Sequence, residues 1–338
     1  MKKNWKAALL AGLSLCLFLA GCGGAGGGGT PAKPKSDLPE RKKISTPVAS
    51  SFKVDGRTVN IYEYTGLTFK DQTLWTEKLA VDGDRIYFFG FDNKDKTYRS
   101  KLRSVSYKDE KLSDLKVLDG RANWRYRLVV SNGTVNDWHK KGDYNSIKAN
   151  SPDYWHYYDG KAMVPTDLRG MTLVPIDQGK DVVYTEGSDY WIGTLEKGKL
   201  TKGKKLLSGT EAKKDDLSLK GQWADKDGFY LMGYLKNDKD GYYHVVRQFS
   251  LKDGKLLQTF EGPPTEESRG FAVTEHRVVL GQKGGIYWIY SKKDGKLLGK
   301  AQTEPKLTME ILTPMKNDSI LIYRRINRSE AKLYRMDL

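Results

Sequence analysis

A short turn sequence occurs twice in this chain and constrains what the chain can form. Residues 250–257 read SLKDGKLL, and residues 291–298 read SKKDGKLL, 41 positions later. Looser copies follow the same order at 108–112, 158–161 and 196–200. Glycine accepts positive φ, so Asp-Gly between β-rich runs is typical of a type I′ hairpin turn. We predict a recurring hairpin whose lysines lie at the solvent edge and whose leucines return to the core.

Longer segments repeat with the hairpin and define its period. Residues 82–91 (DGDRIYFFGF) resemble residues 225–234 (DKDGFYLMGY), 143 positions apart, which is close to three units of roughly 48 residues. Further turns at intermediate spacing are expected at 132–133, 179–180, 275–276 and 317–318. A period in this range with four short strands per unit indicates a β-propeller, because a four-stranded blade must stack on its neighbours to cover both faces. We therefore predict an all-β propeller of six four-stranded blades.

The two ends of the repeat region predict how the ring closes. The last unit offers strands at 311–313, 319–323 and 332–336, and the chain then ends one strand short. A single β-rich run at 58–64 (TVNIYEY) stands alone before the first unit. We predict that this run pairs with 332–336 as the outer strand of the last blade.

The amino terminus has the pattern of a secretion signal. Three lysines precede an apolar run at 7–20, whose 14 residues are fewer than the ~20 that a membrane-spanning helix needs. The run ends in Leu19-Ala20-Gly21-Cys22, which resembles a bacterial lipobox. In lipoproteins of that class the pattern implies diacylglyceryl transfer to the Cys22 thiol and cleavage between Gly21 and Cys22. The resemblance implies a lipid anchor on the extracytoplasmic side of a bacterial membrane, inner or outer.

The leader defines three parts of the chain. Residues 1–21 are predicted to be the signal peptide, 22–51 a flexible tether rich in Gly, Pro and Lys, and 52–338 the propeller domain. Cys16 would leave with the leader, so the mature chain would retain only Cys22. We therefore expect no disulfide in the domain.

One strand and hairpin resemble a known repeat. Residues 285–298 (GIYWIYSKKDGKLL) are similar to the repeat of quinoprotein-like (PQQ-type) propellers, in which an apolar strand leads through a Thr-Gly-Lys turn into a strand ending in tryptophan. That group includes the propeller lipoprotein of the outer-membrane β-barrel assembly machinery, which has eight blades. The resemblance implies a propeller in the cell envelope. Here Asp-Gly replaces Thr-Gly and Gly299 stands at the tryptophan position, and we predict no cofactor.

The charge of the chain bears on its partners. The formal net charge is +16, and removal of the leader with Lys2, Lys3 and Lys6 would leave +13. Such a balance could attract anionic lipid, nucleic acid or anionic cell-wall polymer, although most lysines fall in predicted turns, where a general solubility role suffices. We predict contact with a membrane through the lipid on Cys22, a protein or anionic envelope polymer as partner, and no nucleic acid.

Residues capable of catalysis or metal binding are sparse. The four histidines, none of which has an HxxxH spacing, are His139, His156, His244 and His276. We predict no metal site and expect these histidines in loops or at the surface. Motifs such as GxSxG and the P-loop are absent. Two carboxylates that are distant in the sequence could still lie close together in the fold and act as the acid pair of a glycoside hydrolase.

The second unit is unusually aromatic and predicts a binding face. Its candidate residues are Trp138, His139, Lys140, Lys141 and Tyr144, at and within a long loop at 140–152. Exposed aromatic rings beside cations could stack on sugars or hold a protein partner. The alternative is that the aromatic residues of this unit, 154–158 above all, form a buried strand.

These observations predict a non-catalytic, lipid-anchored cell-envelope scaffold or binding protein that uses a propeller face. The alternative is a carbohydrate-active or small-ligand-binding propeller with its site in the central channel.

Overall fold

The computed structural model describes most of the repeat region. The described residues are 48–66, 72–73, 79–92, 100–108, 111–123, 125–140, 153–237, 241–264, 268–282, 284–302, 309–325 and 331–338. The chain divides into one unit at 1–42 and another at 43–338. All described residues belong to the second unit, so the leader, Gly21, Cys22 and the tether up to residue 47 lie outside them.

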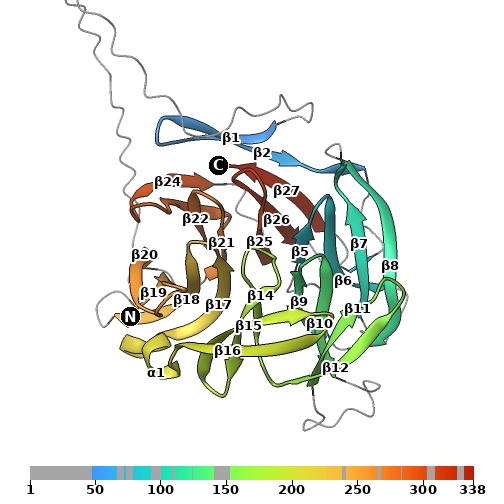
Figure 1. Cartoon of the computed structure of the whole chain (residues 1–338). Helices are drawn as coiled ribbons and strands as arrows, with labels where there is room; N and C mark the ends of the chain where they lie inside the picture. Colours follow the sequence, from blue (N-terminus) through green and yellow to red (C-terminus); the bar gives the residue numbers. More distant parts are fainter. Residues whose placement is uncertain are drawn as a thin grey trace, which may run out of the picture. The chain divides into compact units, whose positions relative to one another are not determined.

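The larger of these two parts, at 43–338, is all-β and forms a six-bladed β-propeller of antiparallel four-stranded sheets (Figure 1). The first blade contains β5 (Leu79–Asp82), β6 (Arg85–Asp92), β7 (Ser100–Ser106) and β8 (Lys111–Asn123), with short strands β3 (Thr65–Gly66) on β8 and β4 (Gln72–Thr73) on β6. The second contains β9 (Arg125–Ser131), β10 (Thr134–Lys140), β11 (Asp153–Tyr158) and β12 (Met163–Arg169). The third contains β13 (Leu173–Pro175), β14 (Asp181–Glu186), β15 (Asp189–Glu196) and β16 (Lys199–Leu207).

The remaining blades follow the same order. The fourth contains β17 (Ser218–Asp225), β18 (Gly228–Asn237), β19 (Gly241–Phe249) and β20 (Leu256–Pro264), preceded by the short helices α1 (Gly209–Ala212) and η2 (Lys214–Asp216). The fifth contains β21 (Ser268–Val273), β22 (Arg277–Gln282), β23 (Ile286–Ser291) and β24 (Leu297–Gln302). The sixth contains β25 (Met309–Met315), β26 (Ser319–Arg325) and β27 (Ala331–Asp337), completed by β2 (Arg57–Glu63) and β1 (Val48–Val54).

The predicted closure is confirmed by the pairing of β2 with β27. Asn60 lies opposite Asp337, and Ile61 lies opposite Met336. The amide of Tyr64 also donates to the carbonyl of Leu333 at 3.0 Å. The sheet continues beyond the expected four strands, because β1 pairs with β2 and makes the sixth blade five-stranded. β1 begins at Val48, which lies within the segment that the sequence assigned to the tether.

Among the described residues, six apolar clusters lie between neighbouring blades, and they explain why the sequence repeats. The cluster between the fourth and fifth blades contains Tyr230, Val246, Val278 and Leu280, all almost fully buried. Corresponding clusters join the other neighbouring pairs around the ring. Because each blade contributes side chains to a cluster on either face, its middle strands read as continuous apolar runs. No helix in the described ranges is long and apolar enough to cross a membrane.

The repeated hairpins join the third and fourth strands of their blades, but they are not type I′ turns. Gly254 and Gly295 have positive φ, at 70° and 71°, whereas Asp253 and Asp294 do not. In the second copy, the amide of Gly295 donates to the carbonyl of Ser291 at 2.9 Å and closes a wider loop. Two successive positive φ values occur in the looser copy at Lys197-Gly198, which joins the third and fourth strands of the third blade, and at first-to-second strand turns such as Asn132-Gly133.

The expected positions of the hairpin side chains are wrong in two respects. Leu256, Leu257 and Leu297 are exposed, because the fourth strand is the outer edge of its blade, whereas Leu298 is partly buried and packs against the cluster between the fifth and sixth blades, as expected. Lys292 is buried at 7% exposure, whereas Lys252, at the same position of the other copy, is exposed. Lys292 of the repeat therefore lies buried between two blades, where it contacts Asp225.

Replacement of Gly254 by alanine is expected to destabilise the protein more than replacement of Gly295. Both glycines have positive φ, which costs an L-residue roughly 1 kcal/mol. A Cβ at Gly254 would also overlap the carbonyl oxygen of Leu206 in the third blade, whereas a Cβ at Gly295 meets only the flexible end of Gln258 at 3.2 Å. Urea unfolding of both variants measures the difference, and equal losses would contradict the contact with Leu206.

Candidate functional sites

The first strands of the six blades surround a channel with a cavity of about 810 Å³. Apolar side chains form most of its wall, and its charged lining residues are Arg127 and Lys220. No aspartate or glutamate of the described residues lines it. Hydrolysis of a glycosidic bond normally requires two opposed carboxyl groups. Among the described residues, this wall contains no such pair of carboxyl groups.

A second cavity of about 370 Å³ lies among the turns between first and second strands, and it does contain acidic residues. Their carboxylates are engaged by neighbouring blades. Asp225 accepts from the Nζ of Lys292 at 2.7 Å, Asp177 accepts from the amide of Lys226 at 2.9 Å, and the Nζ of Lys226 lies 3.7 Å from Glu275. These contacts link the third, fourth and fifth blades to one another.

The third group of interest is a buried cluster in the second blade, formed by Asp137, His139 and His156. Their exposed fractions are 0%, 4% and 6%. Asp137 and His139 are two positions apart on β10 and share one face, while His156 lies directly opposite Asp137 on β11. Val135 on the same face packs in the cluster with the first blade, so the group is on the side that faces that blade.

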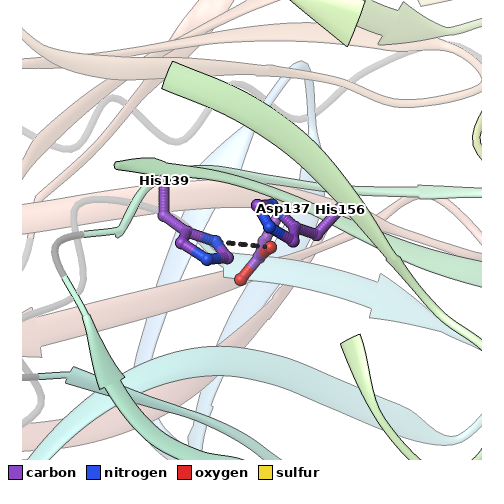
Figure 2. A group of neighbouring side chains, drawn as sticks. All are labelled: Asp137, His139 and His156. Carbon is purple, nitrogen blue, oxygen red and sulfur yellow. Dashed lines mark hydrogen bonds and ion pairs between the residues drawn. The ribbon is translucent and has the colours of Figure 1, made fainter. Parts of the chain in front are cut away.

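The contacts within this group are specific (Figure 2). The Nδ1 of His139 lies 3.1 Å from an Oδ of Asp137. The rings of His139 and His156 stack with centroids 3.8 Å apart and planes inclined by 18°. The Nδ1 of His156 lies 3.2 Å from the carbonyl oxygen of Tyr154. One donor atom from each of the three side chains lies within 4.8 Å of the other two.

The predicted binding face is only partly placed by the structure. His139 is buried, so the expectation that it offers an exposed ring is wrong. Trp138 points to the opposite side of β10, is partly buried against the third blade, and has the guanidinium of Arg127 5.1 Å from its ring centroid. Lys140 ends β10, whereas Lys141 and Tyr144 lie outside the described residues. The alternative of a buried strand is correct at Trp155, which is 1% exposed.

The histidines as a class are also more buried than expected. His139, His156 and His244 lie in strands and are buried, and only His276 lies in a turn with substantial exposure. Sequence inspection missed Asp137 as a member of the group. The available signal was the spacing Asp-x-His, which places two side chains on one face of a strand.

The stability of the protein is expected to fall between pH 6.5 and about pH 4 because of His244. Burial lowers the pKa of His244 to about 4 from an ordinary value of 6.5, and its Nε2 has no hydrogen-bond partner among the described residues. The unfolded chain then binds a proton that the folded chain does not, which costs on the order of 3 kcal/mol below that window. Urea unfolding at several pH values should show that the free energy of unfolding of His244→Gln depends less on pH than that of the wild type. An unchanged dependence would contradict the assignment.

Comparison with known proteins gives a likeness at the level of the fold. No family model matches the sequence, and no curated protein does. The WD40 β-propeller domain of Doa1 is 10% identical with a TM-score of 0.41, over 80% of this chain and 97% of that one. The computationally designed Ika8 protein is 14% identical with a TM-score of 0.39, over 76% of this chain and 69% of that one. Neither score carries an argument, and the assignment as a six-bladed β-propeller follows from the sheet topology itself.

Proposed function

We propose that this chain is a non-catalytic, lipid-anchored propeller that binds a protein or an anionic envelope polymer on the extracytoplasmic side of a bacterial membrane. The channel wall is the observation that carries the non-catalytic assignment, because no carboxylate of the described residues lines it. A closed ring of six sheets is a rigid support for binding surfaces, although the fold alone does not define a partner. The net charge of +16 favours a partner with acidic groups.

The proposed anchor is supported by the leader residues. The apolar run at 7–20 is followed by Leu-Ala-Gly-Cys at 19–22, and residues 23–47 supply a Gly- and Pro-rich connection to β1. In this proposal the mature chain begins at Cys22, residues 22–47 are the tether, and the propeller begins at Val48. Lipid on Cys22 would then hold the domain near the membrane surface without a spanning helix.

Replacement of Cys22 by serine is expected to abolish lipid attachment. When a bacterial host expresses the full chain in the presence of labelled palmitate, the wild-type protein should carry the label and sediment with membranes. Cys22→Ser should lose both properties, because serine lacks the thiol that accepts the diacylglyceryl group. Cys16→Ser is the matched control, since Cys16 lies within the leader and should leave the label unchanged. Label retained by Cys22→Ser would refute the anchor.

The partner is tested by crosslinking in intact cell envelope followed by recovery of the anchored protein. One protein recovered in stoichiometric amount would identify a protein partner. Recovery of cell-wall polymer would identify an anionic polymer as the partner. If neither a protein nor a polymer is recovered, the proposed binding role is contradicted.

The channel supports a second candidate function, the binding of a small anionic ligand. Its volume of about 810 Å³ is within the range of small-molecule sites, and Arg127 and Lys220 supply positive charge. A small carboxylate or phosphate ligand that raises the melting temperature of the wild type but not of Lys220→Gln would support this function. If no ligand of such a panel raises the melting temperature of the wild type, this second function is contradicted.

A further inference from the structure

We propose that Asp137, His139 and His156 form a binding site for one divalent transition-metal ion, with Zn²⁺ as its best match. The group supplies two imidazole nitrogens and one carboxylate oxygen from two adjacent strands of the second blade. Imidazole and carboxylate are established ligands of zinc and of neighbouring first-row metals, whereas calcium and magnesium prefer sites made of oxygen alone. The proposal is independent of the anchor and of the partner.

The contact of His156 with Tyr154 favours the tautomer of that ring that can bind metal. A backbone carbonyl can only accept a hydrogen bond, so the Nδ1 of His156 carries the proton that it shares with Tyr154, and the lone pair of the ring is on Nε2. Metal-bound histidines usually donate their second nitrogen to a carbonyl in this manner. The Nδ1 of His139 lies 3.1 Å from an Oδ of Asp137, so these two atoms lie on the same side of that ring and would contact one ion together.

The group is enclosed by the protein. Asp137, His139 and His156 are 0%, 4% and 6% exposed, so an ion bound among them would be shielded from bulk water.

The dimensions require only a small adjustment. Ligand bonds of about 2.1 Å in a tetrahedral zinc site place donor atoms about 3.4 Å apart. The three donor atoms here lie within 4.8 Å of one another. Rotation of the two rings toward a common point would close the difference. Neither channel cavity is lined by these residues, so the ion would hold β10 and β11 together rather than meet a substrate.

Metal binding by the purified full-length protein in detergent tests the proposal directly. After treatment with a chelator and its removal, the protein is titrated with Zn²⁺ alone by calorimetry and with Co²⁺ alone by absorption spectroscopy. We expect one equivalent of Zn²⁺, a melting temperature raised by at least about 2 °C, and visible Co²⁺ bands of a low-coordinate site. His139→Gln and His156→Gln should each weaken binding by at least about tenfold.

His244→Gln is the matched control, because His244 is also buried in a strand but lies outside the group. It should bind metal as the wild type does. No binding of either ion by the wild type would overturn the proposal without any variant having to fold. Equal affinity in wild type, His139→Gln and His156→Gln would overturn it as well, since the bound ion would then lie elsewhere.

Discussion

A chain that lacks residues 48–64 is expected not to form a stable ring. The deletion removes both strands that complete the sixth blade, together with the buried side chains of Val54, Val59, Ile61 and Tyr62. Burial of each such side chain contributes roughly 1.5–3 kcal/mol, and the sum is comparable with the 5–15 kcal/mol that stabilises an ordinary domain. Circular dichroism during heating should show no cooperative transition, or one at a much lower temperature.

The matched control removes residues 23–47 and leaves β1 intact. That variant should melt close to the wild-type temperature, and equal effects of the two deletions would contradict closure by strand pairing. A point substitution gives a graded version of the test. Ile61→Ala should lose about 2–5 kcal/mol, because Ile61 is 1% exposed and packs in the cluster of the closing blade. Arg57→Ala, at an exposed position of β2, should change stability by less than about 0.5 kcal/mol.

Replacement of Lys292 by methionine is expected to cost about 3–5 kcal/mol, because it leaves a buried carboxylate without its cation. The Nζ of Lys292 lies 2.7 Å from Asp225 and 2.6 Å from Asp227, and it donates to the carbonyl of Thr274 at 3.2 Å. These contacts link the hairpin of the fifth blade to a turn of the fourth. Urea unfolding measures the loss, and the second substitution Asp225→Asn should recover part of it.

Lys252→Met is the control for Lys292→Met, since it changes the exposed lysine at the equivalent position of the repeat. It should alter stability by less than about 0.5 kcal/mol. Burial alone would lower the pKa of Lys292, but the hydrogen bonds and charges of Asp225 and Asp227 outweigh burial and raise it. Because the folded-state pKa is raised, this contribution is complete at pH 7 and is lost only as the pH rises above about 10.5. A loss of stability at pH 7 that is the same for both lysine variants would refute the ion pair.

The fold could be predicted because its determinants are periodic. Turn residues at regular spacing located the blades, and the unpaired run at 58–64 located the closing strand. The pattern did not distinguish Lys252 from Lys292, because their sequence contexts are nearly identical. Their difference arises from Asp225 and Asp227, which lie in another blade and reach only Lys292. A repeat therefore predicts backbone positions better than the environment of individual side chains.

The buried group of the second blade illustrates the same limit. His139 belongs to the predicted binding face, and all four histidines are predicted to lie in loops or at the surface, whereas the buried-strand alternative covers 154–158 and so includes His156. The alternation of β10 instead sends Trp138 to one blade and His139 to the other. Asp137 is important because His156 lies opposite it, and that register is set by the pairing of β10 with β11. Strand register was not available from the spacing of residues along the chain.

Closure by β2 and β27 also determines when this protein can finish folding. β2 must wait for β27, so the contact order of this pairing is high and ring formation is delayed until β27 has been made. Until then, β2 and β26 each expose an edge that other chains could pair with. The chain would remain vulnerable to proteases and aggregation during this interval. Loss of the last residues of β27 would therefore remove the partner of β2, a strand made long before them.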